Sequence, residues 1–279
     1  MRLITFFHDG REQIGVRQDD VVIPVAGSIM QILAEGRLGE VQDEVAKSDT
    51  TGIPVNDIEY LPVIPRPGKI LCIGRNYAAH AAEGGAETPT YPEVFFRGAT
   101  SLIPHRGTII RPQCSETLDF EGEFAFVVGK HCRNATEENA LDCIAGYTLF
   151  NDATIRKYQR LASQWTMGKN FDHTGAFGPE LVTVDELPEG MVGRTLTTKL
   201  NGEMMQEGSI DNLVFPVRQL VMIITECMTL EPGDVVVTGT PSGVGYARKP
   251  PIWMKHGDTV EIEVEGLGKL TNTVRDEAR

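Results

Sequence analysis

The chain has 279 residues, which is enough for one large domain or for a small domain joined to a larger one. Its formal net charge of −13 argues against binding to nucleic acid or to an anionic membrane, because those partners need clustered lysine and arginine. No stretch has the roughly 18 consecutive apolar residues of a membrane span, so we expect a cytoplasmic protein. The five cysteines include no Cys-x-x-Cys pair, which favours reduced, buried thiols over disulfides or a zinc site.

The first 65 residues predict a small α+β domain. Three short apolar runs at 2–8, 12–17 and 21–25 are typical of an antiparallel meander, and helical patterns follow at 28–35 and 41–47. The proline-rich break at 64–68 then suits a linker. We therefore predict a boundary that separates an N-terminal domain, 1–65, from a larger domain, 66–279. The N-terminal part contains no evident chemistry.

The next segment predicts a buried strand at 69–74 that leads into an alanine-rich helix. Gly84 and Gly85 end this helix, in which His80 and Glu83 are i, i+3 neighbours that can hydrogen-bond. A histidine oriented by a carboxylate is the geometry of a general base. A surface His/Glu pair is the more frequent explanation of such spacing, so this pair is weak evidence by itself.

The segment 118–129 reads as one strand and carries two carboxylates. Residues two apart in a strand point to the same face, so Glu121 and Glu123 should stand side by side. Two buried carboxylates repel each other and lose hydration, which a bound cation, a shared proton or a basic partner must offset. A solvated strand face is the alternative explanation for alternating glutamates.

Further candidate residues follow in the next segments. After a helical pattern at 137–143, a strand at 144–152 ends at Asp152, which precedes a helical pattern at 153–162. Asp152 is either the N-cap of that helix or a third oxygen ligand. Lys169 stands in a segment with few charges, and a partly buried lysine near carboxylates is a candidate acid or stabiliser of negative charge.

The last third of the chain predicts more strands than helices. Strand-like runs at 196–200, 235–238 and 259–264 flank one helix at about 216–229, so we expect a strand-rich α+β fold and not a doubly wound one. The loop 238–245 lacks the endings of a phosphate loop and of a serine-hydrolase elbow. Its glycines allow backbone amides and the Thr240 hydroxyl to approach a ligand.

Five motifs in this order resemble the fumarylacetoacetate hydrolase family, in particular its acylpyruvase-like and isomerase-like bacterial members. The likeness covers about residues 69–274. The motifs are Ile73-Gly74-Arg75-Asn76-Tyr77 with His80 and Glu83, Asp119-Phe120-Glu121-Gly122-Glu123, Asn151-Asp152 with Arg156, Gly168-Lys169-Asn170-Phe171-Asp172, and Thr238-Gly239-Thr240-Pro241-Ser242-Gly243-Val244-Gly245.

The resemblance implies a mixed β-sandwich roll, usually a homodimer, that binds Mg²⁺ or Mn²⁺. The implied metal ligands are Glu121, Glu123 and Asp152. It also implies that His80 and Glu83 lie on a segment that orders as a lid, that Lys169 faces the reacting carbons, and that the substrate is contacted by Arg75, Tyr77, Arg156 and Thr240. One departure is Lys157, where the family commonly has an acid next to the arginine.

Residue chemistry agrees with this resemblance. Three carboxylates make an all-oxygen site, which favours Mg²⁺, Mn²⁺ or, in a crystal, Ca²⁺ over zinc. We expect a small 2-oxo acid substrate and hydrolytic cleavage of a C–C bond in an acylpyruvate or related β-diketo acid, through an enolate held on the metal. The alternatives are a decarboxylase or isomerase of an unsaturated 2-oxo dioic acid or oxaloacetate in aromatic catabolism and, more remotely, a non-catalytic metal-stabilised binding protein.

Overall fold

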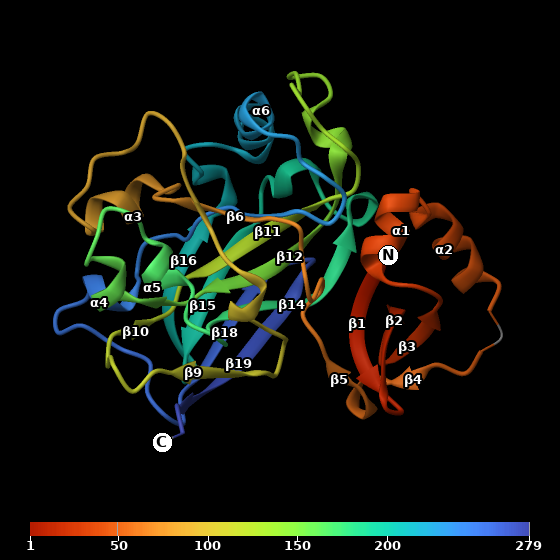
Figure 1. Cartoon of the computed structure of the whole chain (residues 1–279), viewed down its shortest axis with the longest axis horizontal. Coiled ribbons are helices and arrows are strands. Elements are labelled where there is room, and N and C mark those ends of the chain that lie inside the picture. The colour runs from red at the N-terminus through yellow and green to blue at the C-terminus, as the bar shows by residue number, and fades with distance from the viewer. Residues whose placement is uncertain (49, 279) are drawn as a thin grey trace.

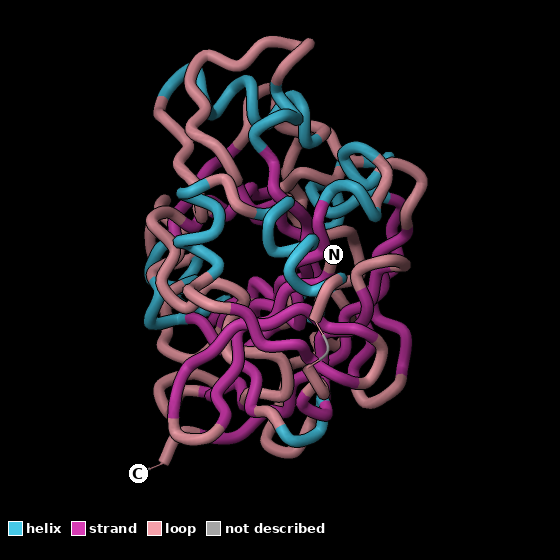
Figure 2. Tube along the Cα trace, turned by 90° about the vertical axis from the view of Figure 1, so that its right-hand side faces the viewer, coloured by secondary structure: helices cyan, strands magenta, loops and turns pink. Residues whose placement is uncertain are grey.

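The computed structural model describes residues 1–48 and 50–278 (Figure 1). Strands dominate it, and they form mixed sheets that contain both parallel and antiparallel pairs. In Figure 2 the strand segments fill the lower part of the molecule, and most helical segments lie in the upper half of the view. The expected strand-rich α+β architecture is confirmed.

Two large sheets build the roll. The first runs, in spatial order, through β4 (Ile53–Pro54), β3 (Val21–Val25), β2 (Arg11–Gln18), β1 (Arg2–His8), β14 (Gly175–Thr183), β12 (Ile144–Asp152), β11 (Gly122–Val128), β17 (Val235–Val237), β6 (Ile70–Gly74) and β7 (Glu93–Phe96). To it are added β5 (Glu59–Tyr60), which pairs with β1, and β8 (Leu102–Ile103), which pairs with β14. The second consists of β16 (Glu203–Ser209), β15 (Thr195–Leu200), β18 (Thr259–Val264), β19 (Gly268–Asp276) and β9 (Thr108–Arg111).

The helices are short and peripheral. They are α1 (Ile29–Glu35), α2 (Leu38–Ala46), α3 (Ala78–Glu83), α4 (Arg156–Gln159), α5 (Thr166–Lys169) and α6 (Val217–Cys227). In the described part of the chain, no helix is long and apolar enough to cross a membrane. All five cysteines are free, as expected, although Cys114 and Cys227 are exposed.

The N-terminal meander and its two helices are present. The hydroxyl of Ser28 accepts a hydrogen bond from the Gln31 amide at 3.1 Å and caps α1, and Gly36 ends the helix with φ of 68°. Strand β1 pairs with β14 through Arg2 and Leu3, so the meander extends the first sheet. The N-terminal segment therefore shares a sheet with the rest of the chain.

Strand β11 is buried over its whole length because the sheet is covered on both faces. The side chains of Phe124 and Phe126 enter the core between the two sheets, together with Leu196 of β15. The alternate residues Ala125 and Val127 belong to the second core, under α1. Because side chains in a strand alternate, Glu121 and Glu123 share the face of Ala125 and Val127.

Three predicted elements differ in the structure. The strand predicted at 118–129 is interrupted before β11, and its start, β10 (Leu118–Asp119), pairs with β13 (Thr154–Ile155). This pairing shortens the helix predicted at 153–162 to α4, since β-branched Thr154 and Ile155 continue as strand. The helix predicted at 137–143 is a 3-10 turn, Ala140–Cys143.

Candidate active site

One cavity of about 350 Å³ collects most of the predicted site residues. It lies where strands β6 and β12 end and β11 begins, and it is closed by α3, by the α4–α5 segment and by the loop 238–245. The predicted residues that line it are Arg75, His80, Glu121, Glu123, Asp152, Arg156, Lys169 and Thr240. Five segments that are distant in sequence therefore meet at one site.

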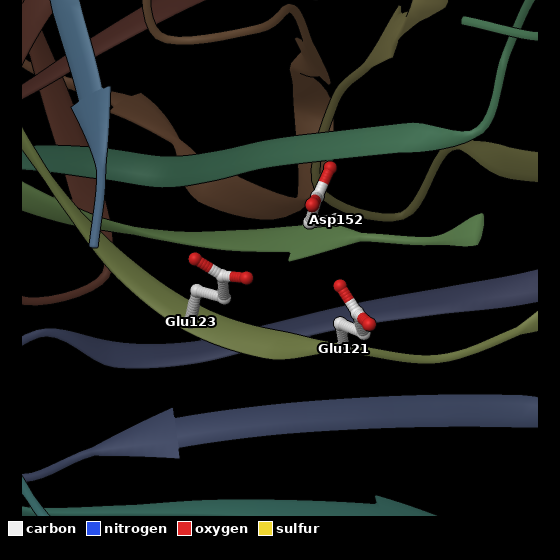
Figure 3. A group of neighbouring side chains, drawn as sticks. All are labelled: Glu121, Glu123 and Asp152. Atoms are coloured by element: carbon white, nitrogen blue, oxygen red, sulfur yellow. The ribbon is translucent and has the colours of Figure 1, made fainter. Parts of the chain in front are cut away.

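Three buried carboxylates form the centre of this cavity. Glu121, Glu123 and Asp152 each offer an oxygen atom, and these atoms lie within 4.8 Å of one another. Figure 3 shows the two glutamates on one segment with Asp152 on the neighbouring strand. The arrangement follows from strand register, because Gly122 pairs with Asn151 and the Asp152 amide donates to the Glu121 carbonyl at 2.9 Å.

Three buried cations surround the carboxylates. The Lys169 ammonium lies 2.5 Å from Oε2 of Glu121 and 2.5 Å from Oδ2 of Asp152. The guanidinium of Arg156 lies 2.6 Å from Oε1 of Glu121, and that of Arg97 lies 2.6 Å from Oδ1 of Asp152. Two of the three carboxylates therefore have direct cationic partners.

The third carboxylate, Glu123, differs in its partners. It accepts a hydrogen bond from the Gly239 amide and forms no ion pair with any cation in the described part of the chain. Burial raises the pKa of Glu123 well above its usual range, and the neighbouring Asp152 and Glu121 carboxylates raise it further. Burial acts the same way on Glu121, but Arg156 and Lys169 outweigh it and hold the pKa of Glu121 below its usual range.

This imbalance of charge fits a divalent cation. When all of them are ionised, the buried groups around the centre carry one more negative than positive charge: Asp119, Glu121, Glu123 and Asp152 against Arg97, Arg156 and Lys169. Placing one more cation among carboxylate oxygens would offset the repulsion that Glu123 experiences. Because all three ligands are oxygen atoms, Mg²⁺ and Mn²⁺ suit the site better than zinc.

A histidine–carboxylate pair stands on another wall of the same cavity. Nδ1 of His80 lies 2.8 Å from Oε1 of Glu83, and the Gly243 amide donates to Oε2 of Glu83 at 2.8 Å. Glu83 thus stands behind His80 and is itself held by the loop 238–245. When the Nδ1–H donates to Glu83, Nε2 remains as the proton acceptor of the ring.

Of the four predicted substrate-binding residues, Arg75, Arg156 and Thr240 line the cavity and Tyr77 does not. Arg75 lines the cavity, pairs with Glu93 and lies 5.6 Å from the Trp165 ring centroid. The Thr240 hydroxyl donates to the Gly122 carbonyl at 2.8 Å, so it also braces the carboxylate segment. Tyr77 is buried beside the cavity and does not line it, and its hydroxyl has no hydrogen-bond partner among the described residues.

Sequence reasoning missed Arg97, Asp119 and Tyr246 as parts of the site. Asp119 accepts hydrogen bonds from Nε of Arg156 at 2.8 Å and from the amides of Gly245 and Tyr246. Position 157, where the family commonly has an acid, is a lysine in this chain, so Asp119 is the carboxylate that pairs with Arg156. Asp119 belongs to the motif Asp119-Phe120-Glu121-Gly122-Glu123, and its position beside two glutamates could have marked it as a site residue. No sequence pattern marks Arg97.

Comparison with known proteins gives a consistent result. The family model described as fumarylacetoacetate (FAA) hydrolase C-terminal matches residues 69–275. A mitochondrial oxaloacetate tautomerase of Bos taurus is 36% identical over 224 residues, which are 80% of this chain and 71% of that protein.

Solved structures match along the whole chain. A fumarylacetoacetate hydrolase from psychrophilic Exiguobacterium antarcticum has a TM-score of 0.87 at 31% identity and covers 99% of this chain and 100% of its own. A probable 2-hydroxyhepta-2,4-diene-1,7-dioate isomerase from Mycobacterium abscessus has a TM-score of 0.82 at 28% identity, with both chains fully covered. The expected roll is thereby confirmed over both parts of the chain.

Proposed function

Because the chain belongs to the fumarylacetoacetate hydrolase family, we propose that it hydrolyses a C–C bond in an acylpyruvate or related β-diketo acid. The products would be pyruvate and a carboxylic acid. The observation that carries this proposal is that the His80–Glu83 pair and the three carboxylates meet at one cavity. A base for water and a site for a 2-oxo acid are the two parts that hydrolysis requires.

The three carboxylates would hold Mg²⁺ or Mn²⁺. When bound, the ion would offer open positions to the carboxylate and keto oxygens of the substrate and stabilise negative charge that develops there. Glu121, Glu123 and Asp152 would be its protein ligands. Arg97 and Arg156 would favour the ionised form of two of these carboxylates and fix them in place, through their contacts of 2.6 Å.

His80 would act as the base. Its Nε2 accepts a proton from water while Glu83 holds the Nδ1–H, and the water oxygen bonds to the distal carbonyl carbon. The C–C bond then breaks, its electron pair passes to the pyruvoyl fragment as an enolate, and a proton returns to that carbon. The Lys169 ammonium, which lies between Glu121 and Asp152, would stabilise the developing negative charge and is a candidate proton donor.

A second candidate is keto–enol tautomerisation or isomerisation of a 2-oxo dioic acid such as oxaloacetate. The 36% identity to the bovine oxaloacetate tautomerase favours it, and decarboxylation of oxaloacetate belongs to the same group of enolate reactions. These reactions add no water across a C–C bond. They need a base that takes a proton from carbon and a donor that returns one, roles that His80 and the Lys169 ammonium would fill.

The His80→Gln variant tests the proposal. With acetylpyruvate and Mn²⁺, we expect kcat to fall by roughly 10²–10⁴-fold, because the base for water is lost. Mn²⁺ affinity, measured by isothermal titration, should not change, because His80 is not a ligand. The matched control is His131→Gln, which removes an exposed histidine outside the cavity. An undiminished rate in His80→Gln contradicts the proposal.

The remaining expectations concern the substrate class, the cellular compartment and the oligomeric state. We propose that the substrate is a small 2-oxo acid and that the enzyme works in the cytoplasm as a homodimer. Sedimentation of the purified protein measures the oligomeric state directly, and a monomer at all concentrations contradicts the dimer.

A further inference from the structure

The active-site cavity contains a cation that the proposed reaction does not use. Arg160, in the segment between α4 and α5, lines the cavity and forms no ion pair with any described carboxylate. The other basic side chains that line it all have a carboxylate partner: Arg75 with Glu93, His80 with Glu83, Arg156 with Asp119 and Glu121, and Lys169 with Glu121 and Asp152.

Tyr246 fixes where the guanidinium of Arg160 lies. The guanidinium carbon of Arg160 is 4.6 Å from the Tyr246 ring centroid, and that of Arg156 is 4.4 Å from it. The Tyr246 hydroxyl reaches α3, since a Cβ built at Gly84 would lie 2.5 Å from it. Arg160 is therefore stacked on a ring that contacts the helix of His80.

The segment that carries Arg160 is anchored at both ends. At its start, Arg156 is held by Asp119 at 2.8 Å. At its end, the Trp165 ring lies edge-on to Phe95 at 5.5 Å and covers Gly74 so closely that a Cβ there would lie 2.1 Å from it. The backbone of residue 160 is thus held beside the cavity, although the arginine side chain is exposed.

The proposed reaction fixes which end of the substrate would reach this arginine. The 2-oxo carboxylate end would lie at Glu121, Glu123 and Asp152, and the distal carbonyl would lie near His80. The acyl group beyond that carbonyl would then extend toward Tyr246 and Arg160. A guanidinium without a carboxylate partner is well suited to bind one in a bidentate manner.

We propose that Arg160 binds a second carboxylate at the far end of the acyl group. The preferred substrates are then acylpyruvates with a carboxylate-terminated acyl group, which are 2-oxo dioic acids, over those with a neutral acyl group such as acetyl. This inference rests on the proposed function for the direction of the substrate. The contact is at the cavity mouth, where water screens it, so the expected preference is about tenfold.

Equilibrium binding tests the assignment without requiring turnover. Isothermal titration of the Mn²⁺-loaded protein would compare 2-oxoadipate with 2-oxohexanoate, which have the same six-carbon chain with and without the terminal carboxylate. We expect the wild type to bind 2-oxoadipate about tenfold more tightly and Arg160→Ala to lose that preference, with Arg160→Lys in between. Arg275→Ala, which removes another exposed arginine, should keep it.

Kinetics with succinylpyruvate and acetylpyruvate separate the two proposals. In Arg160→Ala, KM for succinylpyruvate should rise about tenfold more than KM for acetylpyruvate does. A preference for 2-oxoadipate that survives in Arg160→Ala, or one that is absent from the wild type, overturns the assignment of Arg160. If neither acylpyruvate is hydrolysed but the preference depends on Arg160, the carboxylate site stands and the hydrolase proposal fails.

Discussion

Lys169 lies between two of the three buried carboxylates of the cavity. Its ammonium bridges Glu121 and Asp152, and their negative charges raise the pKa of Lys169 above its usual value against the effect of burial. It therefore neutralises the oxygens that a divalent cation would also use. The residue stabilises the site without a metal and would compete with a bound ion for the same carboxylates.

The Lys169→Met variant separates these two roles. Because the competing charge is gone, we expect Mn²⁺ to bind at least as tightly and to raise Tm more than in the wild type. Turnover should fall about 100-fold, since the group that stabilises negative charge is lost. The measurements are isothermal titration, thermal unfolding and steady-state kinetics, with the exposed Lys255→Met as control. Weaker Mn²⁺ binding in Lys169→Met would contradict this account.

The loop between β17 and the 3-10 turn at 245–247 organises the site at the scale of an element. Its amides hold Glu123 through Gly239, Glu83 through Gly243 and Asp119 through Gly245. Gly239 has φ of +105°, and a Cβ there would lie 2.7 Å from Cβ of Asn76. One loop thus connects the carboxylate centre to the histidine pair.

The Gly239→Ala variant tests the role of this loop. The backbone strain alone should cost roughly 1–3 kcal/mol of stability, and the clash with Asn76 should shift the amide that holds Glu123. We expect a lower Tm together with weaker Mn²⁺ binding. Gly10→Ala is the matched control, because Gly10 also has positive φ but has open space around it. If Mn²⁺ affinity falls no further in Gly239→Ala than in Gly10→Ala, the loop does not support the site.

Element patterns explain which parts of the fold could be predicted from sequence. Runs with clear alternation or helical period, such as 2–8, 144–152 and 216–229, correspond to β1, β12 and α6. The 3-10 turn at Ala140–Cys143 and the early end of α4 depend on packing partners brought in from distant segments. Local periodicity contains no information about such partners.

The site residues, too, could be predicted only where a local sequence pattern marks them. Glu121 and Glu123 could be selected because residues two apart in a strand share a face. Asp152 could be an N-cap or a ligand, and only the family resemblance implied the ligand role. Arg97 could not, since its partner Asp152 is 55 residues away and only the pairing of strands brings them together. Tyr77 stands in a quoted motif, but its side chain turns into the core, and no sequence pattern gives that direction.

At the scale of the whole molecule, the N-terminal strands and the catalytic part share one sheet and one core. Leu3 and Ile32 pack in the same cluster as Ala125 and Phe150. We therefore expect a single cooperative unfolding transition in urea. Circular dichroism reports on the entire chain, whereas fluorescence of Trp165 and Trp253 reports on the part beyond residue 65. Different midpoints for the two signals would show that the N-terminal part unfolds separately.

The central claim is that this cavity adds water across a C–C bond. Proton NMR of acetylpyruvate and, in parallel, of oxaloacetate, each incubated with the Mn²⁺-loaded enzyme, tests that claim most directly. We expect equimolar acetate and pyruvate from acetylpyruvate, at a rate that chelation of the metal abolishes. Intact acetylpyruvate, together with accelerated keto–enol exchange of oxaloacetate, would contradict hydrolysis and establish the tautomerase alternative.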